Sequence, residues 1–583
     1  MACIPSIVIL VFVWKAFFNT LTQAAHALQV PWSTKYYGPD GPWQAVIARV
    51  GGDGSTDTYR QGNVVDLMPG GEWCSWILIS VACSPFHNTP CGQGGFWQPD
   101  DSGTKFQPEW RDFAVGIEEP QAGPQYVDQA MTIGAGEQTV YNTSMAAVRR
   151  IEVTNPDGSK RGPELGTLSL RADDQMQVFG ADGNGAALSA WTYPGGLFNQ
   201  SVIPSYSYGL HIGSATFKYP SSLVFGGYDK GRVIGPYTTF GNVPPTLLDI
   251  GIGVEMGASP FDLTNKTGLL ISNTSIPGPL SVVPDPAVPY LHLPGNTCQA
   301  IANQMPVSFD NKLNYWIWNT TDPTYKSIVT SPAYLSFVFP PSPGNTANVT
   351  IKVPFALLNL TLDTPIVKEP RTYFPCMSFT PNWWDHYRLG RAFLQAAFIG
   401  RNWRTHTSWL AQASGPGSSS TGLGLDVHDI QDKDTALGDA HSQNDTAAFA
   451  RSWEGHWTIL SGRPSGSTTP ASISSSTSVS ASSSSSSVNA ATGFSMGAQV
   501  VIGLGIACSA LDALGTLLLF LHRKRRRVSA EAAATRTIDG GVGELEHKDT
   551  MVTAYEMPDA ARTPELGGTY MAHELPGAYE KAR

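Results

Sequence analysis

Hydrophobic residues in the first 410 positions gather in short alternating or continuous runs, and glycine or proline bounds most of these runs. Such runs are typical of β-strands, and helical periodicity is rare between them. The pattern predicts an all-β folded region over residues 28–410. Its clearest strand-like runs are Trp43–Gly51, Ser222–Tyr228, Ala333–Pro340, Val349–Asn359 and Phe393–Arg401.

An apolar stretch over residues 4–18 precedes the folded region. It is followed by Ala25-His26-Ala27, which has the small-x-small pattern of a signal-peptidase site. We therefore predict a signal peptide over residues 1–27. No basic residue precedes the apolar stretch, so an uncleaved anchor is the alternative.

A second apolar stretch covers residues 498–521. Its 24 residues, at about 1.5 Å each, are long enough to cross a hydrocarbon core of about 30 Å. Five lysine and arginine residues follow at once, within 522–527, which places that end in the cytoplasm. We predict a single-pass type I protein of the plasma membrane, with residues 28–410 outside the cell.

Three further features surround the predicted membrane span. Residues 411–490 are rich in serine and threonine towards their end and predict an O-glycosylated stalk. The tail, residues 522–583, is acidic beyond its basic cluster and either docks cytoplasmic partners or is merely solvated. Gly505, Ser509 and Asp512 share a helical stripe, which indicates self-association of the span or one tolerated polar residue.

The net charge and the absence of certain sequence motifs argue against several classes of function. The net charge of −10 argues against binding nucleic acid, which needs a basic surface. The sequence contains neither a phosphate-binding loop nor paired cysteine and histidine residues at metal-ligand spacing. We therefore expect no metal and no cofactor.

Cysteines and glycosylation motifs fit a secreted context. Five cysteines fall outside the predicted signal and span, so one is left over. Pairing Cys83 with Cys91 and Cys298 with Cys376 would leave Cys74 as a free thiol, although the sequence does not fix this pairing. The glycosylation motifs start at Asn142, Asn199, Asn265, Asn273, Asn319, Asn348, Asn359 and Asn444.

Over residues 30–410 the chain resembles the pepsin-like aspartic proteases, as found in fungal membrane-anchored members. The resemblance implies two β-rich lobes, about 28–205 and 206–410, with a cleft between them. Each lobe of the family contributes an Asp-Thr/Ser-Gly loop, and the two carboxylates share one proton. Six segments in the family's order carry the resemblance: Gly41–Asp53, Val64–Ile77, Cys83–Phe106, Ser205–Asp229, Ser281–Pro294 and Tyr387–Gly400.

The active-site loops depart from the family pattern. In the second loop Asp285 matches the catalytic position, but Pro286-Ala287 follows it. In the first loop, aligning Trp76 with the family's tryptophan puts Pro69, or Met68 with a one-residue shift, where the carboxylate belongs. Asp66 is nearby but would need a three-residue insertion.

Three functions follow from these departures. We expect a pepsin-like domain that has lost catalysis and acts as a surface binding or sensor protein, with a peptide or cell-wall ligand in its cleft. The alternative is an active aspartic-type endopeptidase that uses Asp285 with Asp66. A third is a structural, mucin-like surface protein. Asp285 itself is equally well explained as an Asx-type turn residue.

Overall fold

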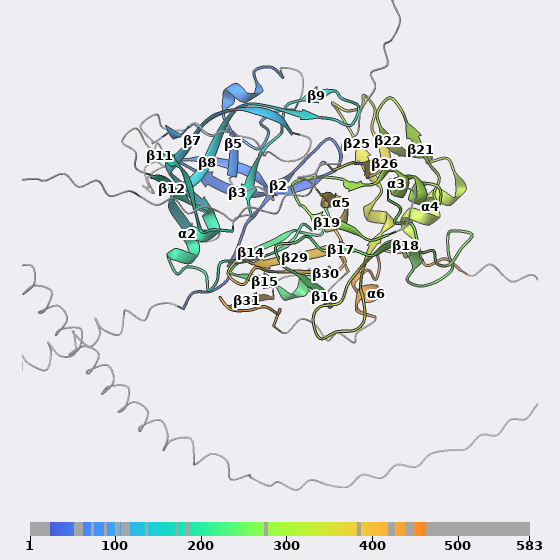
Figure 1. Cartoon of the computed structure of the whole chain (residues 1–583). Helices are drawn as coiled ribbons and strands as arrows, with labels where there is room; N and C mark the ends of the chain where they lie inside the picture. The colour runs from blue at the N-terminus through green and yellow to red at the C-terminus, as the bar shows by residue number, and fades with distance from the viewer. Residues whose placement is uncertain are drawn as a thin grey trace, which may run out of the picture. The chain divides into compact units, whose positions relative to one another are not determined.

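The chain is mostly β-structure with few and short helices, as the sequence predicts. The computed structural model describes residues 24–51, 62–70, 75–86, 90–98, 105–106, 117–133, 138–170, 173–181, 187–272, 278–381, 386–417, 426–438 and 447–461. All of them belong to one compact unit, residues 1–469. Figure 1 shows how the strands of this unit are arranged.

The largest sheet among the described residues has eleven strands, all from the first half of the folded region. At its centre β4 lies between β3, which is antiparallel to it, and β10, which is parallel to it. The strands are β2 (Trp32–Tyr37), β3 (Trp43–Val50), β4 (Asn63–Gly70), β5 (Ser75–Leu78), β6 (Lys105–Phe106), β7 (Ile117–Ile133), β8 (Gln138–Thr154), β9 (Lys160–Arg161), β10 (Gly166–Ser169), β11 (Met176–Ala181) and β12 (Ala187–Trp191).

Three smaller sheets come from the second half. In the first of them β28 runs parallel to β19 and antiparallel to β20. The sheets are β17 (Thr246–Leu247), β19 (Leu280–Pro284), β28 (Tyr387–Leu389), β20 (Leu291–Leu293) and β27 (Cys376–Ser378); β18 (Asp249–Val254), β23 (Ala333–Phe339) and β24 (Val349–Pro354); and β21 (Val307–Asp310), β22 (Tyr315–Trp318), β26 (Arg371–Phe374) and β25 (Leu360–Leu362).

A six-stranded sheet lies below these two groups in the view of Figure 1. It combines a strand from the start of the folded region with strands from residues 207–240 and from residues 397–412. Its strands are, in order, β1 (Leu28–Gln29), β14 (Ser222–Phe225), β13 (Ser207–His211), β29 (Ala397–Asn402), β30 (Thr407–Gln412) and β16 (Ile234–Phe240). Beside it β15 (Gly227–Asp229) pairs with β31 (Val427–Asp429).

The helices are short and locally capped. Thr192 precedes α2, and its side chain accepts a hydrogen bond from the Gly195 amide. Asp322 precedes α4 and caps the Thr324 amide in the same way. The helices are α2 (Tyr193–Asn199), α3 (Gly295–Ala302), α4 (Pro323–Thr330), α5 (Arg391–Leu394) and α6 (Ala448–Ser452), with single 3-10 turns η1 (Ser80–Cys83), η2 (Lys230–Arg232) and η3 (Phe355–Leu357).

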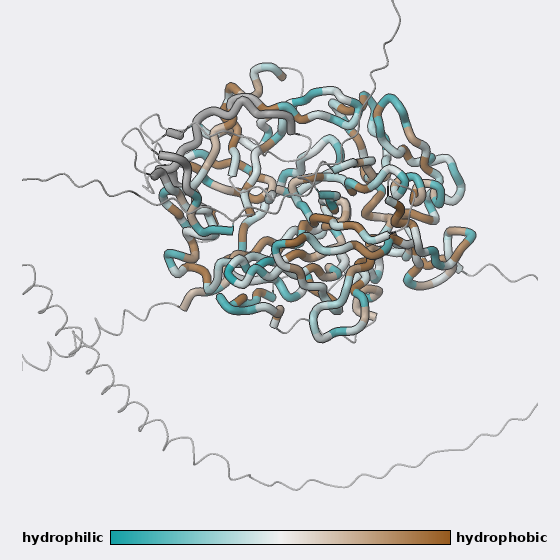
Figure 2. The backbone as a smooth tube through the Cα atoms, in the orientation of Figure 1, coloured by the Kyte–Doolittle hydropathy of each residue, from teal (hydrophilic) through white to brown (hydrophobic). Residues whose placement is uncertain are grey.

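Apolar side chains bury the inner faces of these sheets. In Figure 2 the brown stretches run along the strands, and teal gathers in the connections between them. β23 shows the expected alternation, because its buried residues are Ala333, Leu335, Phe337 and Phe339. One cluster of buried residues extends from Val30 to Trp453 and thus joins both halves of the chain.

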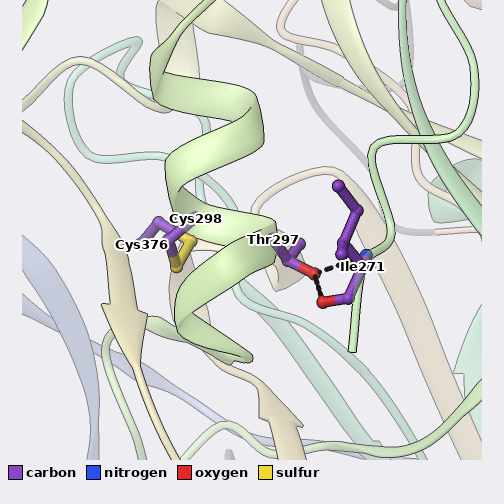
Figure 3. The surroundings of a disulfide bond; sticks show 4 residues. All are labelled: Ile271, Thr297, Cys298 and Cys376. Atoms are coloured by element: carbon purple, nitrogen blue, oxygen red, sulfur yellow. Dashed lines mark hydrogen bonds between the residues drawn. A yellow bond between two sulfur atoms is a disulfide. The ribbon is translucent and has the colours of Figure 1, made fainter. Parts of the chain in front are cut away.

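The structure confirms both disulfides. Cys83 bonds to Cys91, and Cys298 bonds to Cys376. Figure 3 shows the second bond, which ties α3 to β27. Thr297, beside Cys298, accepts a hydrogen bond from the Ile271 amide at 2.9 Å and donates one to the Ile271 carbonyl at 2.7 Å.

The strand predictions hold in part. β3 and β23 match their predicted runs, but the other runs break. The run 222–228 divides at Gly226, which has a φ of 70°, a conformation that glycine adopts readily. The run 349–359 ends in η3. The run 393–401 is wrong at its start, because Phe393 lies in α5 and β29 begins only at Ala397.

The predicted end of the folded region at residue 410 is also wrong. β30 continues to Gln412, and β31 pairs with β15. Beyond them residues 447–461, here called the C-terminal strap, pack onto the unit through Trp453, which is 2% exposed. The sequence hides this segment because its apolar residues are isolated among polar ones. The described part of the predicted stalk is therefore part of the fold.

Other predictions fall outside the described residues. They include most of the predicted signal peptide, Cys74, Asn273, Asn444, the serine-rich stretch from residue 462, the predicted span 498–521 and the tail. Among the residues that the structure describes, no helix is long and apolar enough to cross a membrane.

Candidate functional site

Two parallel strand pairs hold the two candidate loops. In the first half β10 lies beside β4, with Leu168 opposite Pro69. In the second half β28 lies beside β19, with Leu389 opposite Pro284, and the Asp285 amide donates to the Leu389 carbonyl at 3.0 Å. The two halves thus carry the same local arrangement, a strand that ends in a loop and a parallel strand beside it.

A glycine begins or follows the parallel strand in each half. A Cβ on Gly166 would lie 2.2 Å from the Trp76 carbonyl oxygen, and a Cβ on Gly390 would lie 2.4 Å from that of Val288. Neither position therefore has room for a side chain, which explains why both residues are glycine.

Gly70, the last described residue before the first loop, lies close to Ala287 of the second loop. A Cβ on Gly70 would lie 3.6 Å from the Cβ of Ala287. Neither residue has a hydroxyl or carboxylate. Among the described residues, the carboxylates that a two-carboxylate mechanism needs are thus not at this contact.

Asp285 is buried, and both of its oxygens are engaged. Oδ1 accepts a hydrogen bond from the Ala287 amide at 2.9 Å, two residues along the chain. This is the Asx-type turn that the sequence offers as the simpler explanation. Oδ2 forms an ion pair with Arg388 of β28. Asp285 is 4% exposed, so this ion pair compensates a carboxylate removed from water.

The first-half candidates lie on β4. Pro69 is buried and Met68 is 9% exposed, and neither has a titratable group. Asp66 is bonded on its own side of the molecule, where it accepts from Ser33 Oγ at 2.6 Å and from the Tyr37 hydroxyl. Its partners come from β2, whereas those of Asp285 come from the second half. The structure therefore bonds each carboxylate within its own half.

A cavity of about 510 Å³ lies between the halves. Met68, Trp76 and Thr167 line it from the first half, and Ala287, Tyr290 and Phe379 line it from the second. Asp66 and Asp285 are not among its lining residues. Its volume is typical of small-ligand sites.

Asp40 lies at this cavity and connects the two halves, which sequence reasoning missed. Its Oδ1 accepts from Trp43 Nε1 and its Oδ2 from the Tyr290 hydroxyl, both at 2.9 Å. Its carbonyl accepts from the Tyr373 hydroxyl at 2.5 Å. The one signal in the sequence was that this acidic residue lies among glycine and proline residues, in the segment Gly38-Pro39-Asp40-Gly41-Pro42.

Arg391 begins α5 and was also missed. Its Nη1 donates to the Pro286 carbonyl at 3.0 Å and to the Ala287 carbonyl at 2.9 Å, so it fixes the backbone after Asp285. Its guanidinium lies 4.9 Å from the centre of the Trp43 ring. Burial lowers the pKa of Arg391, and Asp40 is the largest opposing influence.

Glu164, just before β10, completes the charged lining. It is 8% exposed, and its Oε2 accepts from the Gly38 amide at 2.6 Å. Burial raises the pKa of this carboxyl, and nearby Asp40 raises it further. Among the described residues, no group of three or more histidine, cysteine or acidic side chains is placed to hold a metal ion.

The predicted glycosylation sites differ in exposure. Asn142 is half-buried, and its Nδ2, the atom that a glycan would occupy, donates to the Ser189 carbonyl at 3.0 Å. Asn359 is also half-buried and accepts from Tyr325. The exposed sites are Asn199, Asn265, Asn319 and Asn348.

Comparison with known proteins finds a structural similarity but no sequence match. No family model matches the chain, and no curated protein matches it. Among solved structures, the crystal structure of an aspartic proteinase from Irpex lacteus is similar, with a TM-score of 0.42 and 14% identity. The match covers 68% of this chain and 100% of that one. At this level the likeness carries no conclusion about the site.

Proposed function

We propose that the folded unit is a pepsin-like domain that binds a ligand between its two halves without hydrolysing peptides. The internal repetition supports the fold assignment, because each half has a strand that leads into the candidate loop and a parallel neighbour beside it, and a sheet combines strands from both halves. The proposal includes the predicted topology, in which a single span anchors the domain at the cell surface as a binding or sensor protein.

One observation carries the loss of catalysis. Peptide hydrolysis by this class needs two carboxylates that share a proton at the floor of the cleft. Here Gly70 lies close to Ala287, and the described candidates, Asp66 and Asp285, are each engaged within their own half. Among the residues that the structure describes at these loops, the acid and base roles therefore have no pair of carboxylates to perform them.

The test is a cleavage assay on the purified full chain. A denatured protein substrate is incubated at pH 3 to 5 with and without pepstatin, and we expect no pepstatin-sensitive cleavage. Asp285→Ala and Asp66→Asn are compared with Asp262→Asn, a control at an exposed position. Pepstatin-sensitive cleavage that is lost in Asp285→Ala but kept in the control would establish the endopeptidase instead.

A further inference from the structure

The charges that line the cavity between the halves are balanced. Asp40 and Glu164 provide two acidic groups, and Arg161 and Arg391 provide two basic ones. An anionic ligand would meet the two carboxylates at close range, and a cationic ligand would meet the two guanidinium groups. The lining therefore favours a neutral ligand that contains both hydrogen-bond donors and acceptors.

Three buried polar groups at this cavity have hydrogen-bonding capacity left. Thr167 Oγ1 and Arg391 Nε are both buried without a hydrogen-bond partner. Glu164 accepts one bond through Oε2, and its carboxyl can accept a further bond through Oε1. The three side chains are 6%, 8% and 8% exposed, in that order. Unmet capacity of this kind is costly unless a ligand satisfies it.

The three groups require different partners. Arg391 Nε only donates, Glu164 Oε1 accepts when the carboxyl is ionised, and the Thr167 hydroxyl can do either. A ligand hydroxyl can also donate and accept, so adjacent hydroxyls of one ring can satisfy all three. A peptide amide, in contrast, presents a donor and an acceptor at separate fixed positions.

Aromatic side chains provide the rest of the lining. Tyr37 and Trp43 come from the first half, and Tyr290 and Phe379 from the second. Such surfaces pack against the apolar faces of a ring while a few polar groups fix its orientation. The volume of about 510 Å³ is enough for a ligand of a few rings.

We propose that this cavity binds a neutral sugar unit of a glycan, oriented by Glu164, Thr167 and Arg391. The inference rests on the proposed binding function and names its ligand class. In this arrangement Arg391 has two roles, since its Nη1 fixes the second loop while its Nε, which has no hydrogen-bond partner among the described residues, is left to donate to the ligand.

The test measures binding of short sugars to the purified full chain by calorimetry. The probes are the neutral trisaccharides of β-1,3-glucose, β-1,4-glucose, α-1,4-glucose and α-mannose, with a trigalacturonate and pepstatin for comparison. We expect saturable binding of one neutral sugar per chain, and weaker or no binding of the anionic one. Thr167→Val and Glu164→Gln should each weaken binding about tenfold, the effect of one buried hydrogen bond.

Glu369→Gln is the matched control, because Glu369 is exposed and is not among the residues that line the cavity. Thr167→Val is nearly isosteric, and an unchanged unfolding temperature verifies that it folds. The proposal is overturned if no neutral trisaccharide binds, or if binding is the same in both lining variants. It is also overturned if pepstatin alone binds and the lining variants weaken it, which would indicate a peptide site.

The same samples separate this inference from the proposed function. Cleavage of denatured protein together with sugar binding would reject the non-catalytic assignment and leave the glycan site standing. Absence of both cleavage and sugar binding would reject the glycan site alone.

Discussion

At the scale of single residues, the pH dependence of stability comes from titratable groups that folding removes from water. His211 on β13 is 1% exposed, and its Nε2 lies 2.9 Å from the Gln395 carbonyl. Burial, together with the nearby Arg232, lowers the pKa of this histidine from 6.5 to about 3. The folded protein therefore holds His211 neutral where the unfolded chain would protonate it.

His211 should make the folded unit sensitive to acid. Because its folded pKa is depressed, its contribution is fully present above pH 6.5 and is lost as the pH falls towards 3. The free energy of unfolding should drop over this window by a few kcal/mol, and His211→Gln should remove much of that drop. Urea unfolding at pH 7, 5 and 4 measures it. His406→Asn is the control, since His406 is exposed and its φ of 52° suits asparagine.

Glu164 should have the opposite effect on the pH dependence of stability. Burial raises its pKa, so its favourable neutral form is lost as the pH rises through the folded value. We expect Glu164→Gln to stabilise the protein against unfolding at pH 7 and to lose that advantage towards pH 4. The measurement is the difference in unfolding temperature between variant and parent as the pH changes. A constant difference across this range would contradict the burial argument.

Single residues also show which parts of the candidate site could be predicted from the sequence. Asp285 could be placed in a turn after a strand, and its Oδ1 does accept a hydrogen bond from the Ala287 amide. Asp40, Glu164 and Arg391 could not be grouped from the sequence, because each lies more than 100 residues from the next. Only the packing of the two halves brings them together. A charged residue alone gives no signal of burial.

At the scale of elements, the two disulfides should differ in their effect. Cys298–Cys376 spans 78 residues and ties α3 to β27, whereas Cys83–Cys91 spans 8. Closing a longer loop removes more entropy from the unfolded chain, so the long bond should contribute about 2 kcal/mol more. Unfolding of the paired serine variants Cys298→Ser/Cys376→Ser and Cys83→Ser/Cys91→Ser tests this order. Equal losses would show that native-state strain or residual structure dominates.

The C-terminal strap is the element that the sequence failed to indicate. Trp453 stacks on Trp457 with ring centres 5.4 Å apart and meets Phe217 edge-on at the same distance. Isolated aromatic residues give no periodicity, so only their partners on distant segments reveal their burial. By contrast, β3 and β23 could be predicted because each carries its own alternation.

Removing the strap's anchor should destabilise the whole unit. Trp453→Ala takes away a side chain that is 2% exposed, and such truncations cost about 3 to 5 kcal/mol. Ile459→Ala is the control in the same segment, because Ile459 is 58% exposed and should change stability by less than about 0.5 kcal/mol. Chemical unfolding of both variants makes the comparison. Similar small losses in both would mean that the strap is dispensable.

At the scale of the whole molecule, buried hydrogen bonds connect the two halves beside the cavity between them. The Tyr290 hydroxyl donates to Asp40 and accepts from Tyr315, at 2.9 and 2.8 Å. Asp40 belongs to the first half, and both tyrosines belong to the second. Because the hydrophobic core is also continuous across the halves, we expect them to unfold in one cooperative transition.

Tyr290→Phe tests this coupling with almost no change in shape. It leaves the buried Asp40 Oδ2 without that donor, which should cost about 1 to 3 kcal/mol of unfolding free energy. If the halves are coupled, calorimetry should show one transition at a lower temperature, because both halves share the loss. The control is Tyr36→Phe, at a tyrosine that is 51% exposed and should shift little. Two separate transitions in Tyr290→Phe would mean that this bond, rather than the shared core, makes the halves unfold together, and two in the parent would reject the coupling altogether.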